Sequence, residues 1–118
     1  MDFKERADQI TKHMRSVPKE DILETWVEEI IKISKEKEEF SDKEISELGC
    51  MIAGLALDVG YNQDNVEMVV HLPGSIRNMI QTRPECQVEP VRSIMFAGQL
   101  TSNGLLLGLL QSGFIIAE

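Results

Sequence analysis

The chain has 118 residues, of which 42% are hydrophobic and 27% charged. This size and composition suit one globular domain with its own core and leave little room for two. The formal net charge of −8 disfavours proteins that bind nucleic-acid phosphates or anionic lipid surfaces through general attraction. Two cysteines are too few for a disulfide framework, and the charged N-terminal residues are unlike a signal peptide. We therefore expect a cytoplasmic protein.

The charges are distributed unevenly along the chain. Residues 1–47 contain 14 of the 20 acidic and 9 of the 12 basic residues, whereas residues 93–117 contain no charged residue. Charged side chains stay in water, so the first part indicates surface helices and the last part a buried element. We predict a single helical domain over 1–118, with a charged N-terminal helical part (1–60) and an apolar C-terminal part (91–117).

Apolar residues at helical spacing predict two helices within residues 3–33. Asp2 and Glu5 have the spacing of a capping box at the start of the first helix. Pro18 ends the first helix and opens the second. The first apolar stripe consists of Phe3, Ala7, Ile10, Met14 and Val17. The second, which places Trp26 in the main core, consists of Ile22, Leu23, Trp26, Val27, Ile30, Ile31 and Ile33.

A third helix is predicted from a second capping box, formed by Ser41 and Glu44. Gly60 is its expected left-handed cap. Its apolar residues are spaced three and four apart and are Ile45, Leu48, Ile52, Leu55 and Val59. Between them lie small residues, Gly49, Ala53, Gly54 and Ala56. Small side chains let a second helix come close, so we expect the Gly- and Ala-rich third and last segments to set the helix crossings.

Residues 66–72 leave two alternatives open. Asp64 and Glu67 resemble a third capping box and favour a helix, whereas three valines in the segment are typical of a strand. In either case Pro73 and Gly74 are expected to break the element, with Ser75 capping a short turn after them. Residues 82–90 contain two prolines and several polar residues, which predicts an exposed loop.

The apolar segment from Val91 to Ala117 contains four glycines. It is predicted as one helix, or as two helices separated near Ser102-Asn103-Gly104, because each glycine lowers helix propensity. The predicted fold class is therefore all-α, a compact bundle of about five helices. The alternative is an α+β fold with a short strand near 66–72.

No group of residues passes the tests for catalysis, metal binding or cofactor binding. Glu67 and His71 lie one helical turn apart but have no second copy elsewhere, as a helical di-metal site needs. Cys50 is expected to be buried and inert. Cys86 is expected to be exposed in the loop, without a base to activate it. We predict no catalytic, cofactor-binding or metal residues; an enzyme would need a pocket joining Glu67, His71 and Cys86.

Nucleic-acid binding and membrane insertion also have specific obstacles. Residues 41–70 resemble a helix–turn–helix, but Asp64 and Glu67 would face the DNA, so we expect no nucleic-acid partner. Residues 93–117 are long enough to cross a membrane, and Gly104 and Gly108 form a G-x-x-x-G motif. Polar residues inside the span and the lack of flanking Trp or Tyr argue for a buried helix. A membrane anchor stays open as the less favoured interpretation.

Apolar stripes without a titratable cluster point to a non-enzymatic helical protein–protein interaction module, a homo-oligomer subunit or small adaptor. The predicted partner-binding residues are Gly104, Leu105, Gly108 and Leu109, because two glycines one turn apart form a groove that another helix can enter. One alternative is an acidic inhibitor or immunity-type protein that masks a basic surface. Another is a small helical enzyme of unknown reaction. No cofactor is expected.

Overall fold

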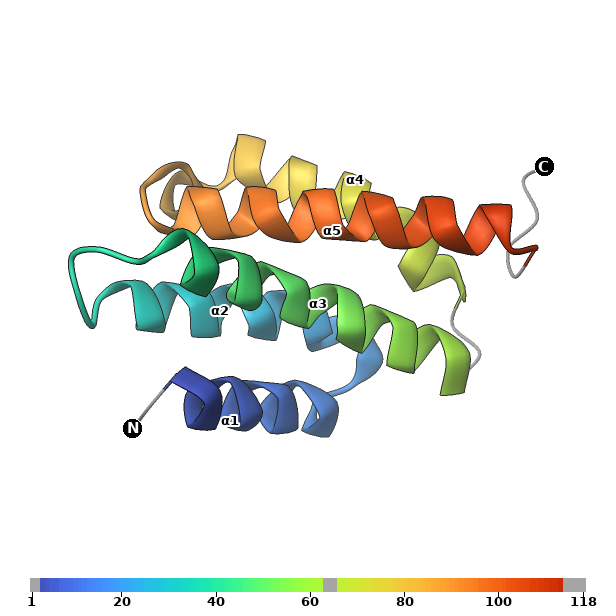
Figure 1. Cartoon of the computed structure of the whole chain (residues 1–118), viewed down its shortest axis with the longest axis horizontal. Coiled ribbons are helices and arrows are strands. Elements are labelled where there is room, and N and C mark those ends of the chain that lie inside the picture. Colours follow the sequence, from blue (N-terminus) through green and yellow to red (C-terminus); the bar gives the residue numbers. More distant parts are fainter. Residues whose placement is uncertain (1–2, 63–65, 114–118) are drawn as a thin grey trace.

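The computed structural model describes residues 3–62 and 66–113, which form five α-helices and two short 3₁₀ helices (Figure 1). The α-helices are α1 (Phe3–Ser16), α2 (Ile22–Ser34), α3 (Asp42–Asn62), α4 (Val66–Thr82) and α5 (Val91–Gln111). The 3₁₀ helices are η1 (Lys19–Asp21) and η2 (Pro84–Gln87). This confirms the all-α bundle of about five helices. The alternative strand near 66–72 is wrong, because this segment is the first part of α4.

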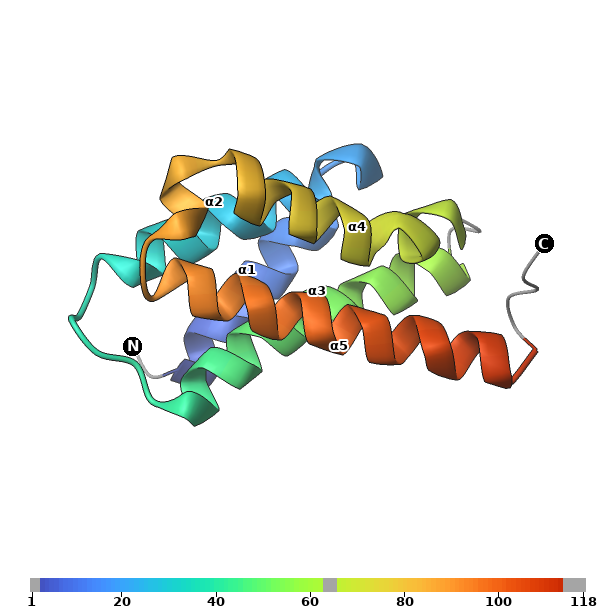
Figure 2. The ribbon, with the colours of Figure 1, turned by 90° about the horizontal axis from the view of Figure 1, so that it is seen from above.

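Consecutive helices run in opposite directions along the bundle, so that α1, α3 and α5 point one way and α2 and α4 the other (Figure 1). Helix α3 packs most extensively against α5, and α4 packs against α5 as well. Helix α1 lies at one side of the bundle and packs on α2 and α3 (Figures 1 and 2). Short connections between antiparallel neighbours give this up-and-down order.

Trp26 of α2 lies at the centre of the core and is fully buried, as predicted. Its indole Nε1–H donates a hydrogen bond of 3.3 Å to the backbone carbonyl of Leu48 in α3. A buried indole needs such a partner, because an unpaired N–H in an apolar core is costly. Trp26 therefore joins α2 to α3 through both packing and a polar contact.

Two glycines allow α5 to approach this tryptophan and α3. A Cβ atom added to Gly98 of α5 would lie 2.8 Å from Cη2 of Trp26. A Cβ atom added to Gly49 of α3 would lie 2.6 Å from Cβ of Ala97 and 2.8 Å from the backbone N of Gly98. Both positions are therefore closed to any larger residue without movement of the helices. The expected role of small residues at this crossing is confirmed at Gly49, whereas Gly54 has no atom within 4 Å of such a Cβ.

The predicted capping box at the start of α3 is confirmed. The Glu44 N–H donates to Oγ of Ser41 at 3.1 Å, and the Ser41 N–H donates to Oε1 of Glu44 at 3.0 Å. Hydrogen bonds from the Lys37 ammonium and from the Ser41 N–H hold the pKa of the Glu44 carboxyl below its usual range. The boxes expected at Asp2 and at Asp64 fall on residues outside the described ranges.

Helix α4 continues through Pro73, so the predicted break there is wrong. Proline inside a helix costs about 3 kcal/mol, because it removes one N–H and crowds the preceding turn. Leu72 and Ile76 are buried on either side of the proline, and full burial of each such side chain contributes about 1.5–3 kcal/mol. Tertiary burial thus outweighs the local penalty.

Three other predicted boundaries need correction. Helix α2 starts at Ile22 rather than near Pro18, because Lys19–Asp21 form the 3₁₀ helix η1. Helix α3 passes through Gly60 and ends at Asn62, so Gly60 is not its left-handed cap. The expected exposed loop at 82–90 contains η2, which turns Cys86 into the core. Of the two interpretations of the C-terminal segment, one continuous helix holds over Val91–Gln111.

We expect Gly49→Ala to destabilise the protein by about 1–3 kcal/mol, because the new methyl group would overlap backbone atoms of α5. Gly54→Ala is the matched control in the same helix. It should stabilise the fold by about 0.5–1 kcal/mol, because alanine has the higher helix propensity and the site is open. Urea unfolding followed by Trp26 fluorescence measures both. Equal stability of the two variants would show that the α3–α5 approach is looser than described.

Candidate interaction surface on helix α5

Helix α5 exposes large apolar side chains along one side. Phe96 is 40% exposed, Leu100 71% and Leu107 58%. Intervals of four and seven residues put these side chains on the same side of a helix. Together with the neighbouring Gly104 and Gly108, both exposed, they form what we name the α5 apolar face.

The opposite side of α5 lies in the core. Val91, Ile94, Met95, Gly98 and Ser102 are buried, and they contact the other helices that surround Trp26. Most of these anchors belong to the first half of α5, so the second half of the helix has less cover.

The four residues predicted to bind a partner are divided between two environments. A Cβ atom added at Gly104 or at Gly108 would meet no atom within 4 Å. Leu105 and Leu109 are partly buried and pack against the core. The glycines therefore take no part in a close contact among the described residues of the chain, and their surface is open. The leucines serve the fold at least in part.

Sequence reasoning missed Phe96, Leu100 and Leu107. Their spacing is helical, but the polar and apolar residues of α5 do not separate into two sides, and only Arg92 carries a charge among its residues. The solvent-facing side of a helix normally carries charged residues. Because α5 lacks such charges beyond Arg92, its sequence does not indicate which apolar residues face solvent.

Helix α5 is the one helix in the described part of the chain that is long and apolar enough to cross a membrane, by length and composition. In its most apolar stretch, 22% of the residues are buried. The core helix of a soluble protein would be mostly buried. The low burial therefore agrees with an extended face that is free to contact something else.

The electrostatic character of the α5 apolar face differs from that of the first two helices. Its N-terminal end carries Arg92, whose guanidinium lies 5.5 Å from the centre of the Phe96 ring, within cation–π range. Acidic side chains in and just after α2 instead form ion pairs: Glu24 of α2 with Arg83 at 2.6 Å, and Glu36, which follows α2, with Arg6. The α5 apolar face is thus the neutral part of an acidic protein.

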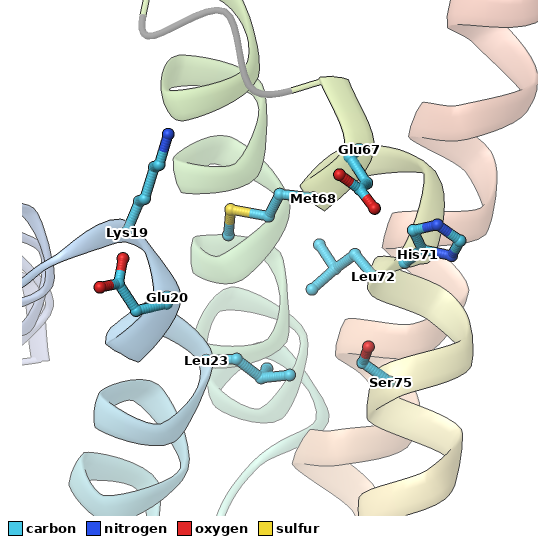
Figure 3. Close-up of a pocket in the computed structure, with 8 residues that line it drawn as sticks. All are labelled: Lys19, Glu20, Leu23, Glu67, Met68, His71, Leu72 and Ser75. Atoms are coloured by element: carbon cyan, nitrogen blue, oxygen red, sulfur yellow. The ribbon is translucent and has the colours of Figure 1, made fainter.

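A cleft lies between the start of α2 and the first half of α4 (Figure 3). Its volume is about 340 Å³, and its lining residues are Lys19, Glu20, Leu23, Glu67, Met68, His71, Leu72 and Ser75. Glu67 and His71 are both exposed at its edge. Among the described residues, no three side chains that can bind a metal come together. Cys86 does not line this cleft, so the structure does not join it to Glu67 and His71.

The predicted environments of the two cysteines are reversed. Cys50 is exposed, and its Sγ lies 3.6 Å from Oγ1 of Thr101 in α5. Cys86 is fully buried, because η2 folds it inward. Burial raises the pKa of the Cys86 thiol, and the nearby Arg83 offsets this in part. The prediction for Cys50 was wrong because this residue lies on an exposed side of α3. The prediction for Cys86 was wrong because a residue between two prolines was assumed to face solvent.

We expect one thiol to react with dithionitrobenzoate in the native protein, and this thiol is Cys50. The raised pKa and burial of Cys86 leave little accessible thiolate near pH 8, so it should react only on unfolding. Cys50→Ser should abolish the fast phase, and Cys86→Ser should leave it unchanged. Two fast-reacting thiols in the folded protein would contradict the burial of η2.

Comparisons of the chain with known protein families, with curated protein sequences and with solved structures found no significant match. What the protein does is therefore inferred from the α5 apolar face.

Proposed function

We propose that this protein is a non-enzymatic helical interaction module that self-associates through the α5 apolar face. The observation that carries the proposal is the exposure of Phe96, Leu100 and Leu107 on one side of a helix that bears a single charge. Large apolar side chains in such a row mark interaction sites on soluble proteins. A second copy of the chain presents the same face and can cover them.

Charge supports a second copy as the occupant. Two copies with a net charge of −8 each repel one another wherever acidic side chains meet. The α5 apolar face contains no acidic residue, so it is a region where two copies can approach without this repulsion. A basic partner would gain little from the same face, because nothing on it attracts positive charge.

The size of the face sets the expected strength of association. From Phe96 to Gly108 it is about 18 Å long, at 1.5 Å per residue, and one helix wide. A strip of this length and width has a smaller area than the roughly 800 Å² that each partner buries in a standard protein interface. Burial of each large apolar side chain contributes up to about 1.5–3 kcal/mol, against an association cost of about 4–15 kcal/mol. We therefore expect a dimer that dissociates in the micromolar range or above.

The acidic-inhibitor alternative has less support. It needs unpaired carboxylates that face a basic partner. Three carboxylates in and just after α2 are, however, already paired: Glu29 lies 3.1 Å from His13 and 3.5 Å from Lys32, and Glu24 and Glu36 are paired with arginines. These ion pairs would have to break before the carboxylates could bind another protein.

Leu100→Gln and Leu107→Gln should each shift the protein toward monomer, because a buried amide replaces an apolar contact at the interface. Light scattering from micromolar to millimolar concentration measures the molar mass. Val70→Gln in α4, a helical residue that is 37% exposed, is the matched control and should leave the association unchanged. Thermal unfolding at high dilution should show similar stability for the three variants, since none of these side chains is buried within one copy.

A wild-type protein that is monomeric over the whole concentration range would reject the proposal. So would a dimer that both leucine variants preserve. Flotation with phosphatidylcholine vesicles tests the remaining alternative, which is membrane binding. If a monomeric wild-type protein floats with vesicles and Leu100→Gln does not, the α5 apolar face binds a membrane instead of a second copy.

A further inference from the structure

We infer that the two copies pair with their α5 helices antiparallel, about a two-fold axis that passes between Asn103 and Gly104. This inference rests on the proposed self-association and adds the orientation of the partner copy and its register. It follows from the order of residues on the α5 apolar face, from the open surface at the glycines and from the charge at one end of the helix.

The two most exposed leucines of the face define the centre of an antiparallel pair. Leu100 and Leu107 lie at equal distances in sequence from the point between Asn103 and Gly104. An antiparallel pair centred there places Leu100 of each copy opposite Leu107 of the other copy. The two most exposed leucines of one copy are then both covered, and Gly104 and Asn103 lie at the crossing point.

The glycines give the larger side chains a place to enter. Gly108 follows Leu107, and no atom lies within 4 Å of a Cβ built on it. In the antiparallel register Leu100 of the partner copy lies opposite Leu107 and beside the open surface at Gly108, which leaves room for its side chain. Facing positions of unlike size interdigitate well in helix packing.

A parallel pair places each residue against its own copy. Leu100 would meet Leu100, and Phe96 would meet Phe96, so the two Phe96 rings would face each other, whereas the antiparallel register sets Phe96 opposite the smaller Gln111. The two Arg92 side chains, each over its Phe96 ring, would also meet at the same end. Like charges and aligned helix dipoles both oppose this arrangement, whereas antiparallel dipoles attract.

Cross-linking between two variants tests the orientation. Cys50→Ser removes the exposed native thiol, and the buried Cys86 is retained. Leu100→Cys and Leu107→Cys are made separately on this background, and one of them carries a short N-terminal tag. The mixture is treated with a short bis-maleimide and separated by size. Val70→Cys on the same background is the control for random collision, and light scattering of untreated wild-type protein reports association independently.

The antiparallel pair predicts that the mixed product, Leu100→Cys joined to Leu107→Cys, exceeds either self-linked product at least several-fold, with Val70→Cys giving only background. Mainly self-linked products would overturn the antiparallel orientation and leave the self-association standing. A dimeric wild-type protein without cross-links above background would place the interface elsewhere. A monomeric wild-type protein would remove the proposed function itself, and the orientation with it.

Discussion

The close approach of α5 to Trp26 is the contact on which the rest of the bundle depends. The indole is fixed by its hydrogen bond to Leu48 and by the core around it. Gly98 lies against the six-membered ring of the indole, and Gly49 admits the neighbouring backbone of α5. Because an added methyl group at either glycine would overlap atoms that cannot move freely, the distance between α3 and α5 is set by these two residues. Protein interiors are close-packed, so a small change here affects the whole core.

The same contact explains how α5 can serve both the fold and an interaction. Its buried residues from Val91 to Ser102 anchor one side of the helix in the core. The other side has no helix on it among the described residues, and its leucines are exposed. A helix with apolar residues on every side and a single charge is normally buried to a large extent. Here it is buried on one side only, and the uncovered side is the physical reason for proposing a second copy.

Glycine has different roles at different places in this chain. At Gly49 and Gly98 the neighbouring atoms leave no room for a Cβ, whereas Gly104 and Gly108 face open space. Gly113 follows α5 with a φ of +82°, the left-handed conformation that favours glycine at a helix end. A left-handed cap was expected for α3 at Gly60, which instead lies inside that helix. The residue type alone therefore does not reveal whether a glycine packs, opens a surface or ends a helix.

The sequence by itself determined the helical class, the burial of Trp26 and the capping box at Ser41, because these follow from periodicity and hydrogen bonds between near neighbours. It also indicated that glycines and alanines of α3 and α5 would set the crossing. Only the tertiary structure decided that α4 passes through Pro73, that Cys86 is buried while Cys50 is exposed, and that Phe96, Leu100 and Leu107 face outward. Each of these depends on which element packs against which side of a helix. In α5 apolar residues occur on every side with polar residues scattered among them, so no local pattern specifies the side that stays uncovered.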